Sequence, residues 1–96
     1  MAERVVERTL SDGGLSIHYR LERLGGDLLL TVTGGAAHVG CVVLTTHRQS
    51  LTGSGADSAD SSVLNRSGHK DEFLLRALAE RLSAVAGCAV AAVGGV

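Results

Sequence analysis

The chain has 96 residues, of which 45% are hydrophobic and 20% charged, and this composition is typical of one small globular domain. Nine Lys and Arg residues against ten Asp and Glu residues give a formal net charge of -1, which argues against nucleic-acid binding through a basic surface. One Tyr, one Phe and no Trp leave no aromatic platform for stacking bases. The sequence has neither an apolar run of membrane-spanning length nor the apolar core of a signal peptide. We therefore expect a single domain over residues 1–96 in the cytoplasm, with no nucleic-acid or membrane partner.

The first third of the chain has the patterns of β-strands. Residues 4–10 form a short run that contains two valines and a leucine. Residues 15–22 then alternate apolar and polar side chains, which is typical of an antiparallel strand with one solvated face. The next residues, 25–27, are Gly-Gly-Asp and suit a tight hairpin. Residues 28–33 are apolar on both faces, so we expect them to return as a central strand.

The middle of the chain predicts one more long strand, a loop and a short strand. Residues 38–46 read as a strand that contains Gly40, a position where another backbone or a ligand could come close. Residues 52–62 hold no large apolar side chain, so they are predicted to form a mobile surface loop. Residues 61–65 are predicted to be a brief extended segment.

One helix is expected near the C-terminus, followed by a last strand at residues 88–93. Ser67 or Gly68 could cap its start, Gly87 its end, and Glu72 and Arg76 are spaced for an i,i+4 ion pair. Apolar side chains recur at helical spacing on one stripe, formed by Leu74, Leu75, Leu78, Leu82 and Val85. The order of elements predicts an α+β domain, an antiparallel sheet with one main amphipathic helix on a face.

The predicted helix start is the most suggestive candidate site. Gly68 would let a ligand approach the backbone, the free amides of a helix N-terminus favour an anion, and Lys70 adds a positive charge. This combination suits one phosphate or carboxylate, although the spacing of a Walker loop is absent. The alternative is an ordinary helix start with a solvated lysine.

A second candidate lies at residues 33–40. The paired glycines before His38 could let a flat ligand lie against the backbone, with His38 as its hydrogen-bond partner. The alternative is a hairpin turn whose histidine begins the next strand.

Signals for an enzyme are weak. Cys41 and Cys88 lie in apolar runs and have no CxxC spacing, so we expect packed thiols, and burial should raise the pKa of Cys41. No GxSxG motif is present, and no two of the four histidines are spaced as metal ligands on one element. We predict no catalytic and no metal-binding residues, and a binding module in preference to an enzyme. A small hydrolase or metal enzyme remains an alternative that requires the histidines to converge in the fold.

The two candidate segments together resemble a known family. His38-Val39-Gly40 opens an apolar strand, and Gly68-His69-Lys70-Asp71-Glu72 opens a helix that continues as LLRALAERL. This pattern, over about residues 16–94, resembles the LpdD-like prenylated-flavin chaperones, the D-type accessory proteins of UbiD-type hydroxyaromatic decarboxylases. The resemblance implies a single LpdD-like domain with a fold similar to the proteasome assembly chaperones.

The resemblance also implies a function. Such a protein would bind prenylated FMN made by a flavin prenyltransferase, assist its maturation and deliver it to a UbiD-type decarboxylase, and it would be a homodimer. His38, Val39 and Gly40 would then lie near the flavin, and residues Gly68, His69 and Lys70 near its phosphate. The alternative is a ligand-free protein-interaction module, in which residues 88–93 form an apolar edge that pairs with a partner chain.

Overall fold

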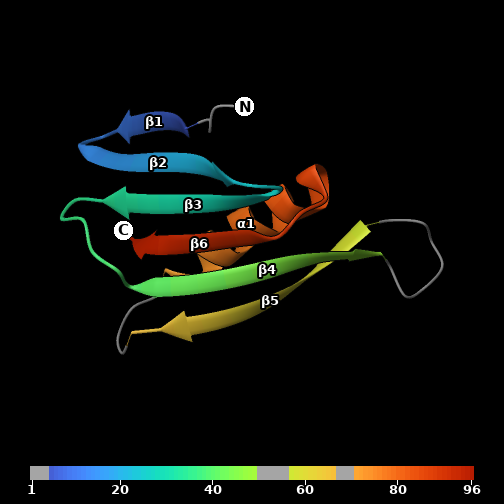
Figure 1. Cartoon of the computed structure of the whole chain (residues 1–96). Coiled ribbons are helices and arrows are strands. Elements are labelled where there is room, and N and C mark those ends of the chain that lie inside the picture. The colour runs from blue at the N-terminus through green and yellow to red at the C-terminus, as the bar shows by residue number, and fades with distance from the viewer. Residues whose placement is uncertain (1–4, 50–56, 67–70) are drawn as a thin grey trace.

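The computed structural model describes residues 5–49, 57–66 and 71–96. In these residues it has six strands and one helix (Figure 1). The strands lie in one sheet in the order β1-β2-β3-β6-β4-β5. Their bounds are β1 Val5–Asp12, β2 Leu15–Leu24, β3 Asp27–Gly34, β4 Cys41–Gln49, β5 Asp57–Asn65 and β6 Val90–Gly95, and the helix α1 is Glu72–Ala86.

The sheet is mixed, and the expectation of a purely antiparallel sheet is wrong. β6 pairs in parallel with β3, with Leu30 opposite Ala92, and antiparallel with β4. The parallel pairing arises because α1 carries the chain from the end of β5 back to the end of the sheet where β5 began. β6 therefore runs in the same direction as β3. β6 is therefore enclosed by two neighbours, so the expected apolar edge at residues 88–93 does not exist.

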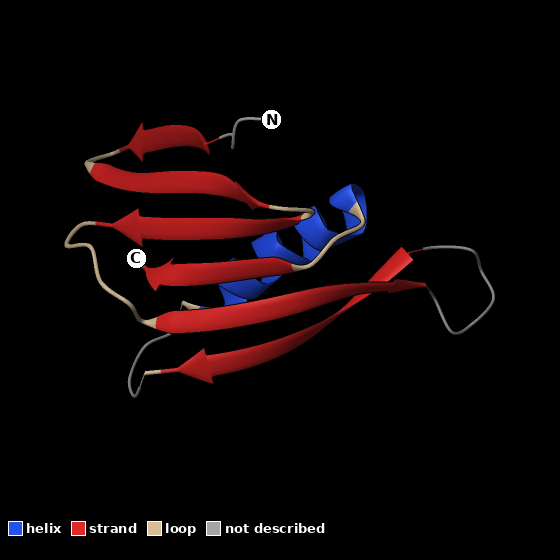
Figure 2. Ribbon diagram, viewed as in Figure 1, coloured by secondary structure: helices blue, strands red, loops and turns tan. Residues whose placement is uncertain are grey.

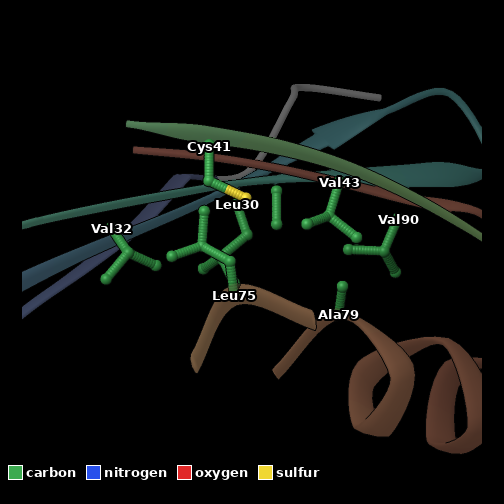
Figure 3. Packing of buried hydrophobic residues seen from close by; sticks show 8 residues of the cluster. Leu30, Val32, Cys41, Val43, Leu75, Ala79 and Val90 are labelled. Carbon is green, nitrogen blue, oxygen red and sulfur yellow. The ribbon is translucent and has the colours of Figure 1, made fainter. Parts of the chain in front are cut away.

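The core lies between α1 and the sheet (Figure 3). Leu75 and Ala79 of the helix are fully buried against Val32, Val43 and Val90 of the strands. The predicted helical stripe is partly correct. Leu74, Leu78 and Leu82 are only partly buried, and Val85 is 75% exposed, because the buried face is rotated toward Leu75, Ala79 and Ser83.

The helix ends are partly as expected. Glu72 and Arg76 form the i,i+4 ion pair at 3.1 Å. Gly87 ends the helix in the left-handed conformation, with φ of 68°, and its amide donates to the Ser83 carbonyl at 2.8 Å. At the start, the cap position is Asp71, whose side chain makes no capping hydrogen bond, and the predicted caps Ser67 and Gly68 lie outside the described residues.

The C-cap gives a test of local stability. We expect Gly87→Ala to lower the free energy of unfolding by about 1 kcal/mol, because an alanine Cβ is strained at positive φ. Chemical denaturation measures it. Gly26→Ala is the matched control, since Gly26 is not at positive φ and a Cβ there would meet nothing within 4 Å. Equal effects of the two substitutions would contradict this explanation.

The middle of the chain differs from its predicted boundaries. β5 begins at Asp57, so residues 57–62 of the predicted loop are in a strand, and residues 52–56 lie outside the described residues. Strand pairing with β4 along its whole length holds these small polar residues in place. Thr45 and Ser61 share a hydrogen bond at 2.7 Å, and the Ser61 hydroxyl donates to Glu80 of α1 at 2.7 Å. β4 itself begins at Cys41, so residues 38–40 precede the strand.

The single described helix covers one side of the sheet only in part (Figure 2). α1 packs on β4, β5 and β6, and β1 and β2 extend beyond it. The opposite side of the sheet, which we call the open face, has no helix over it in the described chain. α1 is too short and too polar to cross a bilayer, and the described residues contain no other helix.

Candidate functional site

The loop that joins β3 to β4 meets the end of β6, at the place where the C-terminus lies in Figure 1. The Gly40 amide donates to the Gly94 carbonyl at 2.8 Å, and the Gly40 carbonyl accepts from the Arg66 amide at 2.9 Å. The Arg66 guanidinium also donates to the Val39 carbonyl at 3.1 Å. We call this place, formed by residues 34–40, Arg66 and residues 94–96, the glycine corner.

His38 is fixed within the glycine corner by contacts on two sides. Its Nδ1 donates to the Ala36 carbonyl at 2.8 Å, since a carbonyl can only accept. Its ring lies over Gly95, because a Cβ built on that glycine would overlap the Nε2 side of the imidazole. The absence of a side chain at Gly95 therefore leaves the room that the partly buried imidazole occupies.

A hollow of about 330 Å³ opens beside His38. It is mostly apolar, and its lining includes Leu15, Ser16, Ile17, Gly34, His38 and Val96. The Val96 amide donates to Asp71 Oδ1 at 3.1 Å, which ties the residue before α1 to the same corner. Backbone, aliphatic side chains and one imidazole thus surround a space of the size of a small-molecule site.

The thiols of the chain are unreactive in character. Burial raises the pKa of Cys41, and the nearby carboxylates of Glu72 and Asp71 raise it further. Burial and then Asp27 raise the pKa of Cys88, which Arg23 lowers in part. Both cysteines are free, and the raised pKa of each thiol disfavours the thiolate that a nucleophile requires. In the described parts of the chain, no three His, Cys, Asp or Glu side chains gather as a metal site would require.

The residues predicted from the sequence fall into two groups. His38, Val39 and Gly40 lie together in the glycine corner. Gly68, His69 and Lys70 lie outside the described residues. Arg66 and Asp71, the described residues on either side of that segment, both bond to the corner.

Sequence reasoning missed the contribution of the chain's last residues to this corner. Gly94 accepts the hydrogen bond from Gly40, Gly95 lies under His38, and Val96 lines the hollow. The paired glycines at the end of an apolar strand were the available signal, because glycine in a strand marks a close approach.

A second hollow lies between α1 and the uncovered hairpin of β1 and β2, and we call it the apolar groove. Its volume is about 410 Å³, and two arginines, Arg8 and Arg81, stand among its lining residues. The other lining residues are large and apolar apart from Tyr19, and they are Val6, Leu10, Leu21, Leu30, Leu78 and Leu82.

The fold is thus that of a small α+β domain with two hollows. One lies beside His38 at the glycine corner, and the other is the apolar groove beside α1. The chain belongs to the prenylated flavin chaperone LpdD-like domain family, whose profile matches residues 11–96. This membership confirms the resemblance found in the sequence. A comparison with curated proteins finds no match.

Proposed function

We propose that this domain binds prenylated FMN and holds it for a UbiD-type decarboxylase. The observation that carries the proposal is membership of the prenylated flavin chaperone family over residues 11–96. The glycine corner supports it independently, because the corner presents backbone, one oriented imidazole and an apolar hollow at one place.

The residues of the corner fit such a cofactor. A flat ring can lie close to a backbone without side chains, and Gly35, which lines the hollow and where a Cβ would meet nothing within 4 Å, provides such a surface beside His38. The hydrogen bond to Ala36 sets the orientation of the His38 imidazole before a ligand arrives. Lys70 and the amides of Gly68 and His69 are the groups we propose for the phosphate monoester.

The domain's own part in the mechanism is to hold and shield. The cofactor supplies the redox chemistry of its ring, including reaction with oxygen during maturation, and the protein supplies orientation and exclusion of water. The hollow beside His38 is lined by Leu15, Ile17 and Val96, which would keep water from a bound ring edge. We propose that a flavin prenyltransferase supplies the ligand and that the domain acts as a homodimer.

Anaerobic titration with reduced prenylated FMN, with plain FMN as the control ligand, tests the proposal. We expect tight binding of the prenylated form and a change of its absorbance after air is admitted. His38→Ala together with Lys70→Ala should weaken binding by about tenfold or more, since charge-assisted hydrogen bonds contribute most to anion affinity.

The matched control is His18→Ala. His18 likewise makes a hydrogen bond through its ring, to Thr9 at 2.8 Å, but it is not among the residues that line the hollow. An equal loss of affinity in both variants would contradict the assignment of the corner. If the unaltered protein binds neither flavin, the proposed function itself is wrong.

A protein-interaction role without a ligand is the second candidate. It is favoured by the open face, where Leu44 is 50% and Leu64 75% exposed beside the partly buried Val42 and Val93. Uncovered apolar surface of this kind is typical of protein contacts. A failed flavin titration would make this second function the better account.

A further inference from the structure

The apolar groove is separate from the features used so far, and the fold explains why it exists. α1 packs over β4, β5 and β6, so the same side of β1 and β2 is left without a helix. Val6 and Leu10 on this side of β1 are 45% and 61% exposed, and Leu78 and Leu82 of α1 border the same space. Large apolar side chains thus face one another across a space that no described segment fills.

Two positive charges stand at this apolar surface without a compensating acid. The described residues that line the groove include Arg8 and Arg81 and no carboxylate. In the described structure neither guanidinium is paired with an acid, and that of Arg8 donates to the Glu7 carbonyl at 2.8 Å. By contrast, Arg20 on the opposite side of β2 contacts both Glu7 and Glu22. The charge of the groove is complementary to an anion.

The groove has the dimensions and chemistry of a ligand site. Its volume of about 410 Å³ lies within the range of small-molecule pockets, which are mostly apolar with a few polar groups that fix orientation. Tyr19, the one tyrosine of the chain, lies in its lining. An aromatic ring and two guanidinium planes are surfaces on which a flat conjugated body can stack.

The groove also continues toward the glycine corner. A smaller hollow of about 240 Å³ shares Leu10 with the groove and shares Leu15 and Ile17 with the hollow beside His38. The lining residues of this smaller hollow therefore connect the apolar groove to the hollow beside His38 along β1 and β2. A long ligand could contact both.

We propose that the apolar groove binds the flat apolar body of an amphipathic aromatic anion, with Arg8 and Arg81 contacting its negatively charged edge. This inference rests on the proposed function in one respect, that prenylated FMN is the natural member of this ligand class. In that case the ring system begins at the hollow beside His38, as proposed above, and its prenylated end extends along β1 and β2 into the groove. The arginines then stabilise negative charge on the reduced ring.

Two ligands and two variants test the groove. The ligands are 8-anilinonaphthalene-1-sulfonate, an aromatic anion whose fluorescence reports apolar binding, and reduced prenylated FMN under anaerobic conditions. We expect the double variant Arg8→Gln, Arg81→Gln and the single variant Leu10→Asp each to weaken both ligands by about tenfold. All three positions are exposed, so the fold should survive, and thermal unfolding checks this.

The controls place the same changes on the open face. Arg20→Gln and Leu64→Asp alter an arginine and an exposed leucine there, and both should leave the two affinities unchanged. Light scattering on every variant reports the molecular mass. Groove variants that change the mass but not the ligand affinities would assign the groove to a second copy of the chain and overturn the proposal.

The outcomes separate this inference from the proposed function. If prenylated FMN binds and the groove variants bind it equally well, the groove proposal is wrong and the function stands. If prenylated FMN does not bind but the sulfonate binds in a groove-dependent way, the function is wrong and a site for this ligand class stands. If neither ligand depends on the groove residues, the inference is overturned.

Discussion

Gly94→Ala is expected to prevent stable folding. Gly94 lies in the centre of the sheet at φ of 149°, and a Cβ there would overlap the carbonyl of Val32 on the neighbouring strand. The atoms that this Cβ would meet belong to the backbone of Val32, so relief of the overlap requires separation of β3 from β6. Loss of this pairing costs on the order of 4 kcal/mol or more, a large part of the stability of a small domain.

Circular dichroism and amide dispersion in NMR spectra would measure the effect, and a melting temperature within a few degrees of the unaltered protein would contradict it. Gly95→Ala is the matched control. There the added Cβ would meet the His38 ring, a side chain that can rotate away. We expect this variant to fold and to show a displaced His38 resonance, so it separates the corner's geometry from the fold.

Leu75→Ala is expected to give the second largest effect. Leu75 is fully buried and lies where α1 meets Val32 and Val43 of the sheet (Figure 3). Removing its side chain leaves a cavity between two rigid layers, which costs about 3 kcal/mol. For a domain of this size the melting temperature should fall on the order of 15 °C.

Chemical denaturation would give the free energy, with Leu64→Ala as the control. Leu64 is 75% exposed on the open face, so its truncation should change stability by less than about 0.5 kcal/mol. A loss at Leu75 no larger than at Leu64 would show that the helix contributes little to the core. The comparison therefore measures how firmly α1 is held over the sheet.

The two large effects have a common origin in the placement of β6. Its two edges pair with β3 and β4, its side chains Val90 and Ala92 pack in the core under the helix, and its last residues build the glycine corner. Core and corner are thus made by one strand. A substitution that disturbs β6 is expected to affect stability and ligand binding together, whereas substitutions of the exposed groove residues Arg8, Leu10 and Arg81 affect binding alone.

Local patterns in the sequence were sufficient for most elements and for part of the candidate site. The alternation at residues 15–22, the glycines of the hairpin turns and the helix end at Gly87 depend on neighbours in the chain, and all appear in the structure. The family resemblance likewise came from short motifs, at His38-Val39-Gly40 and at residues 68–72. It is confirmed by the family match.

Long-range pairing was decided by the tertiary structure. The insertion of β6 between β3 and β4 depends on partners 45 to 62 residues away, and no local pattern encodes them. Its apolar character on both sides was the available sign of a central strand. Small polar residues 57–62 joined the sheet for a similar reason, because β4 satisfied their backbone groups.

The sequence by itself determined most of the strands, the helix and the motifs that mark the family, because these depend on neighbouring residues. Tertiary structure decided what each segment touches. It brought Gly94 and Gly95 to His38, and it left β1 and β2 beyond the reach of α1, so that Arg8 and Arg81 border one groove. The physical reason is that one helix of 15 residues covers only part of a six-stranded sheet.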